Sequence, residues 1–102
     1  MEQTALTETT YYILLSLYKP LHGYGIMQRA AELSGGRGRL AAGTLYGALN
    51  ALVDKGWIAL LPGEGRKNEY KLTPRGLEIL KKELARLREL VASGDMVLKE
   101  EA

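Results

Sequence analysis

The stretch that decides the fold is AGTLYGALNALVDK, residues 42–55, which runs directly into GWIAL, residues 56–60. Its apolar residues recur at spacings of three and four, the period of a helix with one buried face. The buried stripe is Leu45, Leu49, Leu52 and Val53, and the opposite face carries Thr44, Gly47, Asn50 and Ala51. Because these outer residues are small or polar, we expect a helix that can press closely against another molecule or against a neighbouring helix.

Two strand-like segments follow this helix, at residues 57–61 and 69–72. The second alternates apolar and charged residues, the period of a half-buried strand. Between them lies a turn-rich loop that contains two adjacent cations, Arg66 and Lys67. We therefore expect a β-hairpin with a basic tip. Such a hairpin is marginal alone, so it is expected to pack on the helices through Ile58, Leu60, Tyr70 and Leu72.

Before residue 42 the sequence predicts two further helices, over about residues 7–18 and 23–34, separated by Pro20. A glycine-rich basic loop, residues 35–39, follows the second helix. After the hairpin, Thr73 and Pro74 form a helix start signal, with the threonine as cap and the proline in the first helical position. The expected division is a domain over residues 1–73 and a terminal helix and tail over residues 74–102.

The terminal helix carries a heptad seam, because its apolar residues alternate between spacings of three and four. These residues are Leu77, Leu80, Leu84, Leu87 and Val91. We interpret the seam as a dimer contact with a partner helix, although a helix that lies back on its own domain would show the same pattern. Gly94, with its polar neighbours, is expected to end or fray the helix.

Composition limits the possible functions. The 102 residues contain 14 Lys and Arg, 12 Asp and Glu, one His and no Cys, which suits a single globular domain without disulfides or thiolate metal sites. No apolar run approaches the length needed to cross a bilayer and no signal-peptide pattern is present, so a cytoplasmic location is expected. Basic residues gather in the middle of the chain, between slightly acidic ends, as expected for a polyanionic partner.

Enzymatic activity is not expected. Three short glycine motifs begin at Gly23, Gly36 and Gly63, but none completes a dinucleotide-binding fingerprint. With one His and no Cys, nucleophilic catalysis would depend on His22, which lies at a helix entrance where capping is the commoner role. No cofactor or metal is predicted.

The order of three helices, a basic-tipped hairpin and a long helix is that of a winged helix-turn-helix, a mainly α fold with a small β-hairpin. In that fold the third helix enters the major groove of DNA. Asn50 can read an adenine edge, Thr44 can donate to a phosphate, and Gly47 permits close approach. Arg66 and Lys67 at the wing can reach phosphates or an adjacent groove.

Several strings in this order resemble the PadR family of bacterial transcriptional regulators: residues 22–26 (HGYGI), 43–49 (GTLYGAL), 56–58 (GWI) and 66–73 (RKNEYKLT). The resemblance implies a winged-helix repressor, dimeric through its terminal helix, that binds a palindromic operator and is often released by a small aromatic or drug-like molecule. It also implies a contact between Tyr46 and the phosphate backbone, whereas the residues alone predict a half-buried Tyr46. The single terminal helix resembles the short-tailed branch of the family.

Two other functions fit the same layout. A winged-helix module that binds protein would need an exposed apolar patch on the third helix, which Thr44, Gly47, Asn50 and Ala51 do not provide. A ligand-sensing dimer without a nucleic-acid role would leave the basic loops without a purpose.

Overall fold

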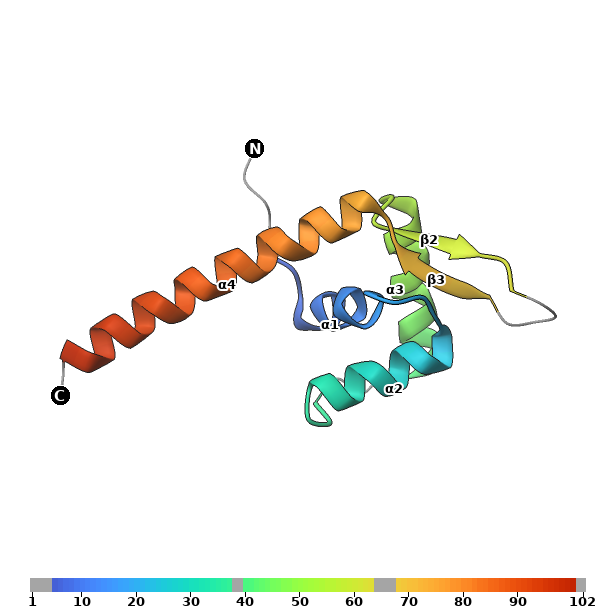
Figure 1. Ribbon diagram of the computed structural model, residues 1–102. Coiled ribbons are helices and arrows are strands. Elements are labelled where there is room, and N and C mark those ends of the chain that lie inside the picture. The colour runs from blue at the N-terminus through green and yellow to red at the C-terminus, as the bar shows by residue number, and fades with distance from the viewer. Residues whose placement is uncertain (1–4, 38–39, 64–67, 101–102) are drawn as a thin grey trace.

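The computed structural model describes residues 5–37, 40–63 and 68–100 of the chain. In chain order its elements are α1 (Glu8–Ser16), β1 (Leu21–His22), α2 (Gly23–Leu33), α3 (Ala42–Asp54), β2 (Ile58–Leu61), β3 (Glu69–Leu72) and α4 (Pro74–Glu100). The first three helices and the small sheet form one body, and α4 extends away from it on the side opposite the hairpin (Figure 1). This arrangement confirms the predicted mainly helical fold with a hairpin wing.

Three of the four helices start with a side-chain cap. The backbone N–H of Thr10 donates to Oγ1 of Thr7 at 3.1 Å, at the start of α1. In α2 the N–H of Gly25 donates to Nδ1 of His22 at 3.0 Å, which confirms the structural role expected for this histidine. Thr73 accepts in the same way from the N–H of Gly76 at 3.0 Å, as its position before Pro74 predicts.

The sheet is antiparallel, with strand order β1-β3-β2. Leu60 pairs with Tyr70 across the predicted hairpin, and Leu21 pairs with Tyr70 on the other side. No sequence pattern indicated β1, because two residues are too few to show a period. Arg66 and Lys67, the predicted basic tip, lie outside the described residues.

The hydrophobic core draws on every helix and on the hairpin. Its buried members are Ile13, Leu14, Leu17, Ile26, Leu45, Leu49, Leu52, Ile58, Tyr70, Ile79 and Leu80. Two residues that the sequence placed in the core, Leu60 and Val53, are not among these buried residues. Leu60, expected to pack on the helices, is 44% exposed, because β2 is an edge strand and the hairpin reaches past the helices (Figure 1). Val53 is only partly buried, at the margin of the α3 stripe.

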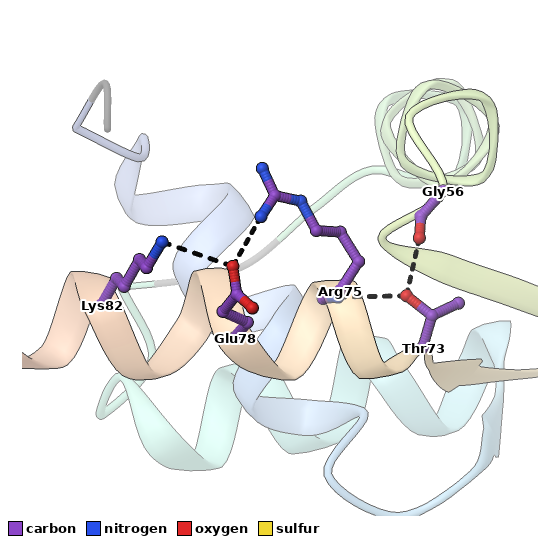
Figure 2. Close-up of polar contacts among 6 residues, drawn as sticks. Gly56, Thr73, Arg75, Glu78 and Lys82 are labelled. Atoms are coloured by element: carbon purple, nitrogen blue, oxygen red, sulfur yellow. Dashed lines mark hydrogen bonds and ion pairs between the residues drawn. The ribbon is translucent and has the colours of Figure 1, made fainter. Parts of the chain in front are cut away.

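A polar junction fixes the start of α4 against the root of the hairpin (Figure 2). The hydroxyl of Thr73 donates to the carbonyl oxygen of Gly56 at 2.6 Å, and Gly56 has the positive φ of 77° that favours glycine. A Cβ at Gly76 would overlap the carbonyl oxygen of Trp57. One turn further on, Lys82 and Arg75 lower the pKa of the exposed Glu78 carboxyl below its usual value.

Glu83 fastens the N-terminal segment to α4. Its carboxylate is buried and accepts two hydrogen bonds of 2.7 Å from the guanidinium of Arg86, and one of 3.1 Å from the backbone N–H of Leu6. The bidentate arginine contact compensates for the burial of the charge. This site holds α4 beside the segment that enters α1.

The helix α4 differs from expectation in two ways. It continues through Gly94 to Glu100, so the prediction that it ends or frays near Gly94 is wrong. A single interior glycine costs about 1 kcal/mol relative to alanine, which a long helix tolerates. The predicted seam is also divided: Leu80 is buried in the core of its own chain, whereas Val91 is 62% exposed. Leu77, Leu84 and Leu87 are partly buried.

Within the described residues, no helix is long and apolar enough to span a lipid bilayer.

Candidate nucleic-acid interface

The outer face of α3 is uncovered. Leu45, Leu49 and Leu52 bury the opposite face in the core, which leaves Thr44, Gly47, Asn50 and Ala51 exposed, as the sequence predicts. A Cβ added at Gly43 or Gly47 would meet nothing within 4 Å. The surface of this face is therefore open at both glycines.

The helix α3 begins without a side-chain cap, unlike the other helices in the described part of the chain. Ala41 occupies the cap position of α3 and makes no side-chain cap hydrogen bond. The first amide groups of a helix carry a partial positive charge and lack partners within the helix. Thr44 lies in this first turn with its side chain exposed, so a hydroxyl and backbone amides are offered together to an anion.

Tyr46 connects α3 to α2. Its side chain is 45% exposed, close to the half-buried position expected from the residues alone. Its phenol lies directly over Gly23, where a Cβ would overlap the ring and the hydroxyl. Sequence reasoning missed this role of Gly23, because nothing within the second helix indicates which aromatic residue will lie over it.

The phenol of Tyr46 also lies near Tyr70 on β3. Burial raises the pKa of Tyr70 above its usual value, and the neighbouring Tyr46 adds to the shift.

The predicted basic loops are only partly described. Arg37 forms an ion pair with Glu8 at the start of α1, and this carboxylate raises the pKa of the Arg37 guanidinium further. Arg39, Arg66 and Lys67 lie outside the described residues. On the wing strand, the exposed Lys71 adds a positive charge that the sequence analysis did not single out.

A cavity of about 230 Å³ lies between α1, α2 and the segment that leads into α3. Its lining consists of Glu8, Thr9, Tyr12, Ala30, Arg37 and Leu40. Two further hollows, of about 330 and 310 Å³, are both lined in part by the exposed Tyr18. The described residues include no group of three or more acidic or histidine side chains that could hold a metal ion.

Three helices with an exposed third helix, joined to an antiparallel hairpin, define the winged helix-turn-helix class. Residues 12–82 match the family described as "Transcriptional regulator PadR-like family". Because this match covers most of the chain, the protein belongs to the PadR-like family of transcriptional regulators. Membership confirms the resemblance seen in the sequence, and the members of this family are transcriptional regulators rather than enzymes.

Solved structures agree with this assignment. A PadR-like transcription factor from Bacteroides fragilis superposes with a TM-score of 0.73 at 28% identity, covering 86% of this chain and 87% of that one. RosR of H. salinarum gives a TM-score of 0.69 at 26% identity, with 90% and 96% coverage. A PadR family regulator from Eggerthella lenta, at 24% identity and a TM-score of 0.72, covers 87% and 80% and shares the fold.

Two curated relatives are longer than this chain. An uncharacterized 37.1 kDa protein of transposon Tn4556 from Streptomyces fradiae is 44% identical over 64 residues, which are 63% of this chain and 18% of the relative. The LexA repressor of Limosilactobacillus fermentum is 30% identical over 90 residues, 84% of this chain and 42% of the repressor. The chain therefore spans less than half the length of either relative.

Proposed function

We propose that the protein is a sequence-specific DNA-binding repressor that acts in the cytoplasm as a homodimer on a palindromic operator. The observation that carries the proposal is the exposed face of α3, where Asn50 stands beside the open backbone of Gly47 in a family of transcriptional regulators. The likeness to a protein named LexA repressor supports repression over activation.

Each exposed residue of α3 suits one part of DNA recognition. The amide of Asn50 can form paired hydrogen bonds with an adenine edge in the major groove. Thr44 can donate to a phosphate at the uncapped helix start, where the helix dipole favours an anion. Tyr46 carries its hydroxyl at the border between α2 and α3, where it can reach the phosphate backbone. Arg66 and Lys67, in the loop of the wing, would contact phosphates or an adjacent groove.

The alternative, a winged-helix module that binds protein, is less well supported. Such a module needs an apolar patch on α3. The large apolar side chain on the outer face of this helix is Tyr46, and its ring packs over Gly23 of α2. Small and polar residues fit a DNA groove better than they fit a hydrophobic interface.

A small-molecule effector would release the protein from DNA by binding in one of its cavities. The cavity beside Tyr12 has apolar walls formed by Ala30 and Leu40 and adjoins the segment that enters α3. A small aromatic or hydrophobic molecule bound there would change the path into the recognition helix. Titration of the complex of protein and operator with such compounds should lower DNA occupancy, and the Ala30→Leu variant, which fills the cavity, should respond less.

Binding to genomic promoter fragments at two salt concentrations tests the DNA proposal. If about six to ten phosphates are neutralised per dimer, affinity should fall about 10³–10⁵-fold between roughly 50 and 200 mM salt. Absent binding, or binding that does not change with salt, would contradict the proposal and favour the protein-binding alternative.

The Gly47→Ala variant tests whether α3 approaches DNA closely. The added methyl group meets no atom of the protein, and alanine favours a helix by about 1 kcal/mol over glycine, so the variant should be as stable as the parent or more so. Its operator affinity should nevertheless fall at least tenfold. The reverse change on the same face, Ala51→Gly, is the matched control, which should lose stability but keep its affinity.

A further inference from the structure

The outer face of α3 carries an acidic residue that the proposed DNA contacts do not use. Residues three and four apart lie on one side of a helix, so Gly47, Asn50, Ala51 and Asp54 form one continuous stripe. All four are exposed, and the buried leucines of α3 lie on the other side. The carboxylate of Asp54 therefore belongs to the same surface as the amide of Asn50, one helical turn further on.

The fold of the free protein gives Asp54 no stabilising contact. It is the last residue of α3, where the partial negative charge of the helix end repels an acidic side chain. No ion pair in the described part of the chain involves it. The adjacent Lys55 holds its ammonium group over the ring of Trp57, 4.8 Å from the centroid. The carboxylate is thus an exposed charge that lowers the stability of α3.

The spacing of the stripe suits contact with base edges along the whole helix. In homeodomains, the residues that reach bases in the major groove are separated by three, one and three positions along the recognition helix. Gly47, Asn50, Ala51 and Asp54 have the same separations. Because Gly47 and Ala51 are small, the helix can approach the groove closely, and the short side chain of Asp54 then reaches a base.

A carboxylate in the major groove discriminates among the bases by charge. An ionised aspartate accepts hydrogen bonds and donates none. Cytosine presents an N4 amino donor in this groove, whereas guanine and thymine present acceptors and adenine presents a donor beside an acceptor. The phosphates repel the carboxylate in every sequence, so binding is favoured where a base donates to it.

We propose that Asp54 is a specificity-determining residue that accepts a hydrogen bond from the N4 amino group of a cytosine in each half-site. This inference rests on the proposed DNA-binding function and adds a base contact to the adenine contact of Asn50. Asp54 lies about 6 Å beyond Asn50 along the helix, which corresponds to roughly two base-pair steps of ~3.4 Å. The cytosine should therefore lie within that span of the adenine.

Selection of tightly bound duplexes from a pool with a randomised central segment tests this contact without a known operator. The parent should select the cytosine, and replacing it in the selected duplex should weaken binding about tenfold. Asp54→Asn should prefer adenine at the same position, because an amide pairs with the N6 and N7 atoms of adenine. Asp54→Ala should lose the preference for cytosine and should bind non-specific duplexes more tightly than the parent does.

Glu89→Gln is the matched control. It removes one exposed negative charge from the part of α4 that extends away from the rest of the molecule (Figure 1), and it should select the same bases as the parent. Asp54→Asn should unfold at a slightly higher urea concentration than the parent, since it removes a negative charge from the end of α3. A change in base preference therefore cannot be assigned to unfolding or to net charge.

The possible failures are distinct. If Asp54→Asn and Asp54→Ala keep the base preferences of the parent, the inference is overturned, even if both bind every duplex more tightly, because the carboxylate then acts by repulsion from phosphates alone. A parent that selects a sequence without a cytosine in the expected span overturns it as well. A parent that enriches no sequence at low salt would instead contradict the proposed sequence-specific DNA binding.

Discussion

At the residue scale, the position of Tyr46 depends on a glycine in another helix. The Gly23→Ala change should destabilise the protein by about 1–3 kcal/mol, because the new methyl group overlaps the phenol of Tyr46. In the background of Tyr46→Ala, the same change should cost nothing or add slight stability. Urea unfolding of the four variants in this double-mutant cycle measures the coupling. Equal costs in both backgrounds would show that the overlap is relieved without strain.

Tyr70 gives a second prediction at this scale, on alkaline stability. Burial and the nearby Tyr46 raise the pKa of Tyr70 above its ordinary value near 10. The folded state therefore holds the phenolic proton more tightly than the unfolded state does. This difference in pKa adds to the free energy of unfolding. The added stability is complete below about pH 10 and is lost as the pH rises through the raised pKa of Tyr70 in the folded state.

Urea midpoints measured from pH 8 to 11 should thus decline more steeply for the parent than for Tyr70→Phe, which has no proton to lose. Parallel curves for the two proteins would assign the decline to the other tyrosines and lysines.

At the element scale, the two halves of α4 differ in burial along one face. Its first half completes the core through Ile79 and Leu80, and its second half leaves Leu90 and Val91 in solvent. The heptad spacing grouped Leu80 and Val91 into one predicted dimer seam, but it could not distinguish the buried residue from the exposed one. A seam residue buried in its own domain and one kept for a partner have the same local sequence pattern.

Val91→Asp should therefore split the proposed dimer without unfolding the chain, because a charge is placed on an apolar contact that is exposed in the monomer. The expected readout is a shift to the monomer in sedimentation velocity, with an unchanged helical circular dichroism signal. Ala92→Asp adds the same charge on the other side of the helix and should remain dimeric. If the Val91→Asp variant remains a dimer, the interface lies on another surface of the protein.

At the scale of the whole molecule, α4 carries one winged domain and would set its distance from the domain of a second copy. A rigid homodimer reads two half-sites separated by about 34–36 Å, or one turn of DNA, or by multiples of this distance. Inserting about five base pairs between operator half-sites should therefore weaken binding at least tenfold, since it rotates one site to the far side of the duplex. Gel-shift titration of the two operators measures this, and unchanged affinity would mean that each domain binds independently.

The sequence by itself determined the local features of this protein. Helix caps at His22 and Thr73, the buried stripe of α3 and the alternation of β3 depend on residues within a turn or a strand, so they can be read in chain order. The exposed face around Asn50 follows from that stripe, and with it most of the candidate interface.

Only the tertiary structure decided which long-range contacts form. It placed Tyr46 over Gly23, paired β1 with β3, left Leu60 at the edge of the sheet and buried Leu80 of α4 in the core of its own chain. Each of these outcomes depends on residues far apart in the chain, or on how much of a helix its own domain covers. Such contacts have no period in the sequence, because their free energy arises only when separate elements come together.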